Sequence, residues 1–288
     1  MRRPILLRST GNRGRNARPR SDPPLARSGA NYIVAMTNPR VAAFTMVRDE
    51  SNFLDIWLRH YQTVLPQADL VVLDHLTSDD SIKHAAQVHN FQVKPVNHPA
   101  YDDFGWYTER IEAEQRELLN DYDVVVFAES DELLWHPDGL SAVVSRLKHD
   151  AIRAVGWQVI EQPDEPPVVV DRTLLPQRST WFRRPTFDKT LITTVPLKYS
   201  HGFHHAEPEQ PRDDDLLLIH LHTIDKRWAR EKKRRIVTYA DYDQQTKQTN
   251  LGWHNRVVDD EFDRWWSNLE LQFRMEPIPQ AISDAFPT

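Results

Sequence analysis

Three carboxylates follow an apolar run in the middle of the chain. The segment from Val124 to Ala128 is entirely apolar and rich in valine, and Glu129, Asp131 and Glu132 come directly after it. Such a run predicts a buried, parallel strand, and acids at its carboxyl end lie where open α/β sheets bind their ligands. Hard oxygen ligands suit Mg²⁺ or Mn²⁺, ions that are commonly shared with substrate phosphates. The simpler interpretation is an exposed acidic turn after a core strand.

Side chains two positions apart on a strand share a face of the sheet. We therefore expect Glu129 and Asp131 to point together as metal ligands, with Glu132 turned away. His220 and His222 belong to a later apolar run and would also share a face if that run is a strand. His220 is accordingly a candidate to complete a metal site begun by Asp131.

A basic segment follows these histidines. Seven of the ten residues from Lys226 to Arg235 are lysine or arginine, in a part of the chain that is otherwise acidic. Arginine and lysine bind phosphate oxygens, so Lys226, Arg227 and Arg230 are candidates to neutralise a diphosphate. The alternative is a solvated basic helix face.

Acids also follow the first two predicted strands. Asp49 and Glu50 come after the first, and Asp74 and Asp79 come after the second. An acid at the end of an early strand of a nucleotide-binding sheet commonly contacts a ribose or base, so all four are candidates to bind a nucleotide. Because each also precedes a predicted helix, Asp49 and Asp79 (or Ser78) could instead be helix N-caps.

The elements that would position these residues alternate between strand and helix up to about residue 130. Alternation of this kind predicts an α/β fold, a mostly parallel central sheet flanked by helices. Later segments look like strands separated by proline-rich loops, followed by a basic helix, and the last forty residues have no clear fold signal. The expected strands are 41–47, 70–73, 91–96, 124–128, 151–160, 190–195 and 216–221, and the expected helices are about 51–64, 79–88, 107–119 and 226–239.

Composition divides the 288 residues unevenly. Residues 1–40 hold nine of the 36 basic residues and one of the 42 acidic residues, which leaves 27 basic and 41 acidic residues for the rest. We expect 1–40 to be a disordered basic leader, with Met36 as an alternative start, 41–245 to be the catalytic domain and 246–288 to be a helical or irregular extension. An acidic body makes a nucleic-acid partner unexpected, and no run is long enough to span a membrane. Zero cysteines exclude disulfides and thiolate chemistry, which fits a cytoplasmic protein.

Several of these motifs resemble those of glycosyltransferase family 2-like proteins. The segment from Val47 to Tyr61 is similar to their opening theme, N-E-x-x-x-L-x-x-W-x-x-H-Y, with Asp49 where the family more often has asparagine. Their metal motif, D-x-D-E-[FL], is matched by Glu129 to Leu133 except that glutamate replaces the first aspartate. The resemblance covers about residues 41–235. Its other elements are Asp74–Ser81, Lys189, Gly202–His204 and His220–His222.

This resemblance implies a GT-A-like nucleotide-binding sandwich that transfers sugar from a nucleotide-diphosphate sugar to an acceptor hydroxyl, with inversion. It implies a Mn²⁺ or Mg²⁺ cofactor, held by Asp131 and His220 and, directly or through water, by Glu129. The acceptor would be a glycan, a lipid-linked or a small molecule, and analogy at the level of the fold suggests surface-polysaccharide precursors. The resemblance implies that Glu132 supports the metal site or contacts the sugar, and that Glu161, Asp164 or Asp188 is the base. The implied donor-binding residues are Asp49, Glu50, Asp74, Asp79, Lys189, Lys226 and Arg230.

Two other functions use the same residues. A nucleotidyltransferase or phosphohydrolase would hold its metal with the same acids, but no glycine-rich phosphate loop follows the first strand. A non-catalytic carbohydrate-binding relative would keep the fold and lose the chemistry, and the glutamate at position 129 leaves that alternative open.

Overall fold

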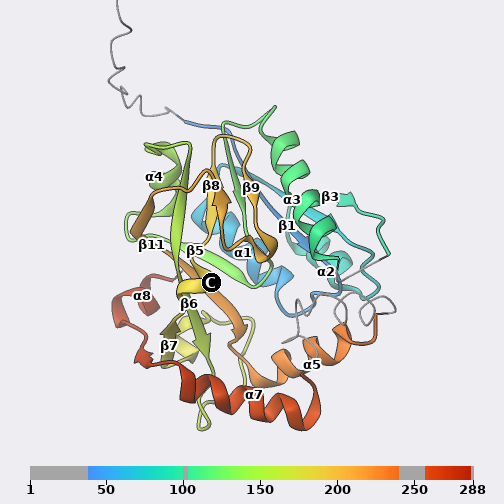
Figure 1. Ribbon diagram of the computed structural model, residues 1–288, viewed down its shortest axis with the longest axis vertical. Helices are drawn as coiled ribbons and strands as arrows, with labels where there is room; N and C mark the ends of the chain where they lie inside the picture. The colour runs from blue at the N-terminus through green and yellow to red at the C-terminus, as the bar shows by residue number, and fades with distance from the viewer. Residues whose placement is uncertain (1–37, 100–102, 240–256, 287–288) are drawn as a thin grey trace, which may run out of the picture. The chain divides into compact units, whose positions relative to one another are not determined.

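The computed structural model describes residues 38–99, 103–239 and 257–286, all within one compact unit that spans 35–288 (Figure 1). The expected leader up to residue 37, the start at Met36 and residues 246–256 of the expected extension lie outside the described residues. Among the described residues, no helix has the length and apolar character to cross a membrane.

The first half of the chain forms the parallel part of the sheet. Its strands are β1 (Val41–Val47), β2 (Ala68–Asp74), β3 (Gln92–Pro95) and β4 (Val124–Phe127), in the order β3-β2-β1-β4. β1 and β4 are buried at every position, which explains why both sequences are continuous apolar runs rather than alternating ones. All four carboxyl ends therefore meet at one edge of the sheet.

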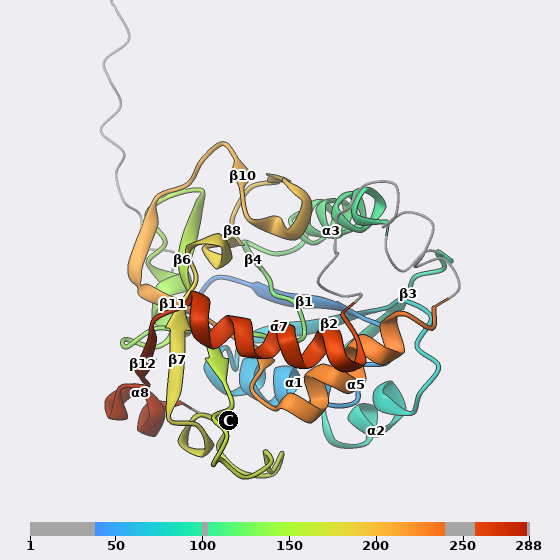
Figure 2. The same cartoon turned by 60° about the horizontal axis from the view of Figure 1, so that its bottom comes forward.

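Helices cover both faces of these strands. They are α1 (Leu54–Val64), α2 (Ser81–Val88) and α3 (Phe104–Leu118). Figure 2 shows α3 on one side of β1 and β2 and α1 and α2 on the other. The apolar face of α1 that the sequence predicts, which includes Trp57 and Tyr61, is buried, and α3 begins where Asp103 accepts a hydrogen bond from Trp106 N at 2.9 Å.

The second half extends the sheet with mainly antiparallel strands. β8 pairs with β4, and the path continues through β6 and β7 to β12. The long strand β11 lies between β5 and β6, antiparallel to the first and parallel to the second. The elements are β5 (Glu132–Trp135), α4 (Leu140–Ser145), β6 (Ala151–Ile160), β7 (Thr180–Arg183), β8 (Thr190–Thr193), β9 (Lys198–Tyr199), β10 (Ala206–Glu207), β11 (Arg212–Thr223) and β12 (Met275–Pro277), with 3-10 turns at Leu175–Gln177, Pro185–Phe187 and His201–Phe203.

The C-terminal segment is part of the same unit. α5 (Lys226–Ile236) and α7 (Asp259–Gln272) lie side by side, and α8 (Gln280–Ala285) follows β12 (Figures 1 and 2). Ile160, Phe182, Phe262 and Trp266 form a second buried cluster between the sheet and these helices. Because β12 pairs with β7, the chain end adds a strand to the main sheet as well as helices.

The α/β class expected from the sequence, a central sheet flanked by helices, is confirmed. The parallel half matches the strand–helix alternation. The sequence did not indicate the antiparallel strands β5, β7 and β12, which are only three or four residues long, and α7 was not predicted as a separate helix.

Candidate functional site

A cavity of about 500 Å³ lies at the carboxyl ends of the parallel strands. Arg48 and Glu50 follow β1, His75 follows β2, and the acidic turn follows β4. This is the edge at which open α/β sheets bind ligands. Its described lining residues are Met46, Val47, Arg48, Glu50, His75, Phe104, Tyr107, Glu129, Ser130, Asp131, Glu132, Gln158, Arg184, Thr186, Phe187, Lys189, Gly202, Phe203, His204, His220, His222, Lys232, Ile236 and Trp265.

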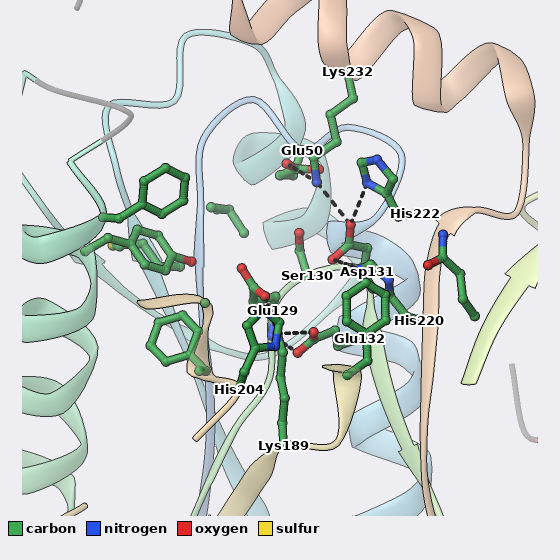
Figure 3. Close-up of a pocket in the computed structure, with 18 of the residues that line it drawn as sticks. Glu50, Glu129, Ser130, Asp131, Glu132, Lys189, His204, His220, His222 and Lys232 are labelled. Atoms are coloured by element: carbon green, nitrogen blue, oxygen red, sulfur yellow. Dashed lines mark hydrogen bonds and ion pairs between the residues drawn. The ribbon is translucent and has the colours of Figure 1, made fainter. Parts of the chain in front are cut away.

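The acidic run forms a tight turn between β4 and β5. β4 ends at Phe127, and the Glu132 N–H donates to the Glu129 carbonyl at 2.9 Å. Strand alternation therefore does not apply to these residues, and the prediction that Glu129 and Asp131 point together is wrong. Glu129 and Glu132 both turn to Lys189, whereas Asp131 turns toward the histidines (Figure 3).

Lys189 lies between the two glutamates. Its Nζ donates to Glu129 Oε2 at 2.6 Å and also to Glu132 Oε1. Lys189 and Glu132 side chains are only 3% and 1% exposed, while Glu129 is 34% exposed. Burial alone would lower the pKa of Lys189, but the charges of the two glutamates outweigh burial and raise it. Lys189 is thus a charged lysine that neutralises the floor of the cavity.

β11 brings the late histidines to the acidic turn. It pairs with β5 so that His220 lies opposite Glu132, and the Leu221 N–H donates to the Asp131 carbonyl at 2.8 Å. β5 is held in turn by α1, where His60 Nε2 contacts the Leu134 carbonyl at 2.8 Å. The shared face expected for the two histidines is confirmed, since their rings stack with centroids 5.8 Å apart.

Asp131, His220 and His222 form a candidate metal site. His220 Nε2 lies 3.6 Å from Asp131 Oδ1, and His222 Nδ1 lies 3.5 Å from Asp131 Oδ2. One ligand atom from each of the three residues lies within 4.8 Å of the others. Among the described residues, the remaining ring nitrogens, His220 Nδ1 and His222 Nε2, are buried without a hydrogen-bond partner.

This donor set fits a divalent cation. Burial lowers the pKa of His222 to about 3, so its imidazole is neutral and able to act as a ligand. Imidazole nitrogens suit transition-metal ions, and carboxylate oxygens suit Mn²⁺ and Mg²⁺. The mixed set therefore fits Mn²⁺ better than Mg²⁺, which prefers oxygen ligands.

A lysine of α5 reaches the same carboxylate. Lys232 Nζ lies 3.3 Å from Asp131 Oδ2 and 2.9 Å from Glu50 Oε1 (Figure 3). Burial would raise the pKa of Asp131, but the charge of Lys232, followed by His220, holds it well below its usual value. Arg235 lies 4.0 Å from the same Glu50 oxygen. The cavity thus pairs its acids with Lys189, which directly precedes β8, and with cations from α5.

The first two loops use their aspartates mainly to hold each other. Asp49 lies at φ 55°, a left-handed conformation that aspartate tolerates better than most residues. Its Oδ1 accepts the backbone N–H groups of Ser78 at 2.6 Å and Asp79 at 3.0 Å, and its Oδ2 accepts the Tyr239 hydroxyl at 2.7 Å. Burial raises the pKa of Asp49, but these hydrogen bonds lower it by more, so the pKa of Asp49 lies below its usual value.

Asp74 and Asp79 make contacts within their own loop. Asp74 Oδ1 accepts the Thr77 N–H at 2.9 Å, and Asp79 Oδ1 accepts the Ser81 N–H at 3.0 Å at the start of α2. Asp49, Asp74 and Asp79 are not among the described lining residues, whereas Glu50 is. Phe53 and Asp80 occupy the N-cap positions of α1 and α2, and neither helix has a side-chain cap hydrogen bond, so the prediction that Asp49 and Asp79 (or Ser78) are N-caps is wrong. The aspartates hold loop amides instead.

The three residues expected as the base lie outside the cavity lining. Glu161 Oε2 accepts the Lys226 N–H at 2.7 Å, at the start of α5. Asp188 accepts the Gly156 N–H at 2.9 Å and pairs with Arg183 at 2.6 Å. Asp164 is exposed. The first two carboxylates are engaged in holding the backbone and a neighbouring arginine.

The basic helix α5 has two charged faces. Lys226 and Arg230 both pair with Asp263 of α7, at 3.0 Å in the case of Lys226, so they contact the neighbouring helix and do not line the cavity. Lys232 and Arg235 contact Glu50 on the other face. Lys232 was not among the residues predicted from the sequence, although its position relative to Lys226 and Arg230 in a 3.6-residue period separates the two faces.

Other lining residues were not among the predicted site residues. Arg184, His204 and Trp265 come from segments that the sequence left as loops or as an unassigned tail. Burial lowers the pKa of His204 to about 4, so this histidine is neutral. His204 belongs to the Gly202–His204 element of the family resemblance, whereas no sequence signal distinguished Arg184 and Trp265 from the other arginines and tryptophans of the chain.

No protein-family model and no curated protein matches the sequence. Among solved structures, the chain is similar to the mannosyltransferase PcManGT from Pyrobaculum calidifontis in complex with GDP-Man and Mn²⁺. The identity is 13%, the match covers 80% of this chain and 68% of that chain, and the TM-score is 0.41.

Two further solved structures show weaker likeness. They are S. aureus TarS (11% identity, 75% of this chain and 43% of that chain, TM-score 0.35) and glucosyl-3-phosphoglycerate synthase from Mycobacterium tuberculosis in complex with Mn²⁺, UDP and glucosyl-3-phosphoglycerate (13%, 41% and 44%, TM-score 0.29). The match thus spans less than half of either of these chains. Every one of these TM-scores is below 0.5.

Proposed function

We propose that the protein is a metal-dependent glycosyltransferase that moves a sugar from a nucleotide-diphosphate sugar to an acceptor hydroxyl. The observation that carries the proposal is the meeting of Asp131, His220 and His222 within 4.8 Å at the carboxyl end of β4. The same cavity is lined by Glu50 and His75 from the loops after β1 and β2, where a nucleoside would lie. The cofactor in this proposal is Mn²⁺ or Mg²⁺, which Asp131, His220 and His222 would hold.

The side chains of the cavity match the charge changes of this reaction. Negative charge grows on the leaving diphosphate, and cations fixed in a dry site stabilise it. Arg48, Arg184 and Lys232 line the cavity and supply such cations. A bound divalent ion would add Lewis-acid stabilisation of the same charge. In this proposal Lys189 holds Glu129 and Glu132 in place and does not contact the diphosphate.

The acceptor and the base are assigned to further residues of the cavity lining. Phe187, His204 and Trp265 offer flat aromatic surface to a sugar or acceptor. Glu129 lines the cavity and is 34% exposed, against 7% for Asp131 and 1% for Glu132. We therefore assign Glu129, in place of Glu161, Asp164 or Asp188, as the base that takes the acceptor proton during inverting transfer. An acceptor of either kind, free or lipid-linked, must bring its hydroxyl to this carboxylate.

The first test is calorimetric binding of UDP and GDP with and without Mn²⁺. We expect metal-dependent binding of one nucleotide, and we expect Asp131→Asn to abolish the dependence on metal. Asp213→Asn is a matched control, because Asp213 also faces a histidine, His136 at 3.7 Å, but lies outside this cavity. Binding that ignores both metal and Asp131 would move the nucleotide site elsewhere.

The second test identifies the bond that breaks. Incubation with the matching nucleotide sugar, Mn²⁺ and a panel of hydroxyl acceptors should release nucleoside diphosphate as the sugar passes to the acceptor oxygen. Glu129→Gln should slow this release while leaving nucleotide affinity within about twofold, as expected for a base that acts in the transition state. Release of sugar phosphate and nucleoside monophosphate would instead indicate a phosphohydrolase. Binding without turnover on any acceptor would indicate a carbohydrate-binding relative.

A further inference from the structure

Lys232 occupies a position between two functional regions of the cavity. Its ammonium contacts Asp131, a candidate metal ligand, and Glu50, which follows β1 on the nucleotide side. The side chains of Lys232, Asp131 and Glu50 are 13%, 7% and 6% exposed, so water screens these charges poorly. Figure 3 shows Lys232 extending from α5 into the space between Glu50 and Asp131, beside His222.

A lysine and a divalent cation would compete for this carboxylate. Lys232 Nζ and His222 Nδ1 both approach the same oxygen, Asp131 Oδ2, at 3.3 Å and 3.5 Å. A cation bound by Asp131 and His222 would therefore lie next to the ammonium. Charges of the same sign at such a distance repel strongly where water is excluded. The cation and the lysine in its present position thus disfavour each other.

The contacts of Lys232 allow it to move. A lysine side chain is a compact charge on a flexible stem, and Lys232 lines the cavity in which a diphosphate would lie. Glu50 would keep a cation nearby if the ammonium left, because Arg235 lies 4.0 Å from the same oxygen. Asp131 would exchange the ammonium for the divalent cation. Glu50 and Asp131 would therefore each have a positive neighbour both before and after the ammonium moves.

We propose that Lys232 couples binding of the divalent cation to binding of the nucleotide diphosphate. In the nucleotide-free protein its ammonium holds Asp131 and keeps the affinity for the cation low. When a diphosphate enters, Lys232 turns to the phosphate oxygens and gives up Asp131 to the cation. This inference rests on the proposed function, and it makes Lys232 a residue that sets the order of binding in addition to its contact with the diphosphate.

The test measures Mn²⁺ binding without turnover, from the electron paramagnetic resonance signal of free Mn²⁺. Lys232→Met should bind Mn²⁺ in the absence of nucleotide about tenfold more tightly than the wild type, within the range usual for coupled sites. Lys232→Arg keeps the charge and should resemble the wild type. Lys94→Met is the matched control, because Lys94 also bridges two carboxylates, Glu114 at 2.7 Å and Glu117 at 3.0 Å, away from the cavity.

The second arm adds saturating UDP or GDP to the same titrations. In the wild type, the nucleotide should strengthen Mn²⁺ binding, and in Lys232→Met this gain should fall at least about fivefold, because the part of the coupling carried by the lysine is lost. Circular dichroism verifies folding, and Lys232→Gln replaces the methionine variant if that protein does not fold. Any smaller effect of the nucleotide on Mn²⁺ binding that remains in Lys232→Met would come from direct attraction between the cation and the diphosphate.

Two outcomes would overturn the inference, and they differ in what they leave standing. If Asp131→Asn abolishes Mn²⁺ binding but Lys232→Met leaves the nucleotide-free affinity unchanged, Lys232 does not compete with the cation and the proposed function is unaffected. If Asp131→Asn leaves Mn²⁺ binding unchanged, the cation binds elsewhere, and both the coupling and the metal assignment are wrong.

Discussion

Lys189→Met removes the ammonium group that Glu129 and Glu132 share in the floor of the cavity. Methionine keeps most of the volume of the lysine stem, so the main change is the loss of the charge. Water reaches Glu129, which is 34% exposed, but does not reach Glu132, which is 1% exposed. The variant therefore leaves one buried carboxylate without its cation.

Removing one partner of a buried ion pair costs about 3–5 kcal/mol. We expect Lys189→Met to lower the free energy of unfolding by that amount near neutral pH, a large part of the roughly 5–15 kcal/mol typical of folded domains. Burial raises the pKa of Glu132 even beside Lys189, and the loss of the lysine raises it further. A carboxyl whose pKa is higher in the folded state destabilises the protein above its unfolded pKa, so the deficit should shrink as the pH falls toward 4.5.

Urea unfolding followed by circular dichroism measures this effect. Lys94→Met again serves as the control, because its buried partner Glu114 keeps Arg110 at 2.7 Å, so the expected loss is at most about 1 kcal/mol. The double variant Lys189→Met/Glu132→Gln should regain most of the lost stability, since position 132 then carries no buried charge without a cation. Equal losses in the two methionine variants, or no recovery in the double variant, would refute the reasoning.

Three other predictions follow from single contacts. Asp49→Ala should lower the free energy of unfolding by about 1–3 kcal/mol in urea titrations, because the Ser78 and Asp79 amides lose their acceptor. Asp49→Asn keeps that acceptor and should lose less than about 1 kcal/mol. Equal losses in the two variants would indicate that the charge of Asp49 matters more than its hydrogen bonds. Phe262→Ala should lower the free energy of unfolding by about 3–5 kcal/mol and speed hydrogen exchange in α7, because this ring of α7 is fully buried. A negligible loss of stability would contradict this packing. Burial lowers the pKa of His60 from 6.5 to about 4, so the unfolded chain binds more protons between these values. Stability should therefore fall with falling pH there, by up to about 1.4 kcal/mol per pH unit, and His60→Gln should flatten the slope; an unchanged slope would count against a neutral buried His60.

The regular elements of the first half could be predicted because each has a strong local signal. β1 and β4 are buried on both sides and read as continuous apolar runs, and α1 has an apolar face at helical spacing. α7 had a readable signal too, since its buried residues Phe262, Trp266 and Leu269 recur at helical intervals. The short strands β5 and β12 carry no such pattern, because pairing with β11 and β7 places them in the sheet.

The candidate site could be predicted in part. Glu50, Glu129, Asp131, Glu132, Lys189 and His220 were expected from the sequence and do line one cavity. Asp188 and Glu161 were expected as bases, but their partners, Arg183 and the start of α5, come from other segments. An acid beside a motif looks the same in the sequence whether it faces substrate or holds a backbone amide.

The sequence by itself determined which chemistry is available. Its apolar runs placed acids at the ends of parallel strands, its histidine pair lay on one strand face, and its lack of cysteine excluded thiolate chemistry. Tertiary structure decided which of these groups meet. The turn at Glu129 sent Asp131 to the histidines and the glutamates to Lys189, and α5 brought in Lys232 from a hundred residues away. Local signals depend on neighbours along the chain, whereas a binding site depends on charged groups that approach one another only when the chain folds and its strands pair.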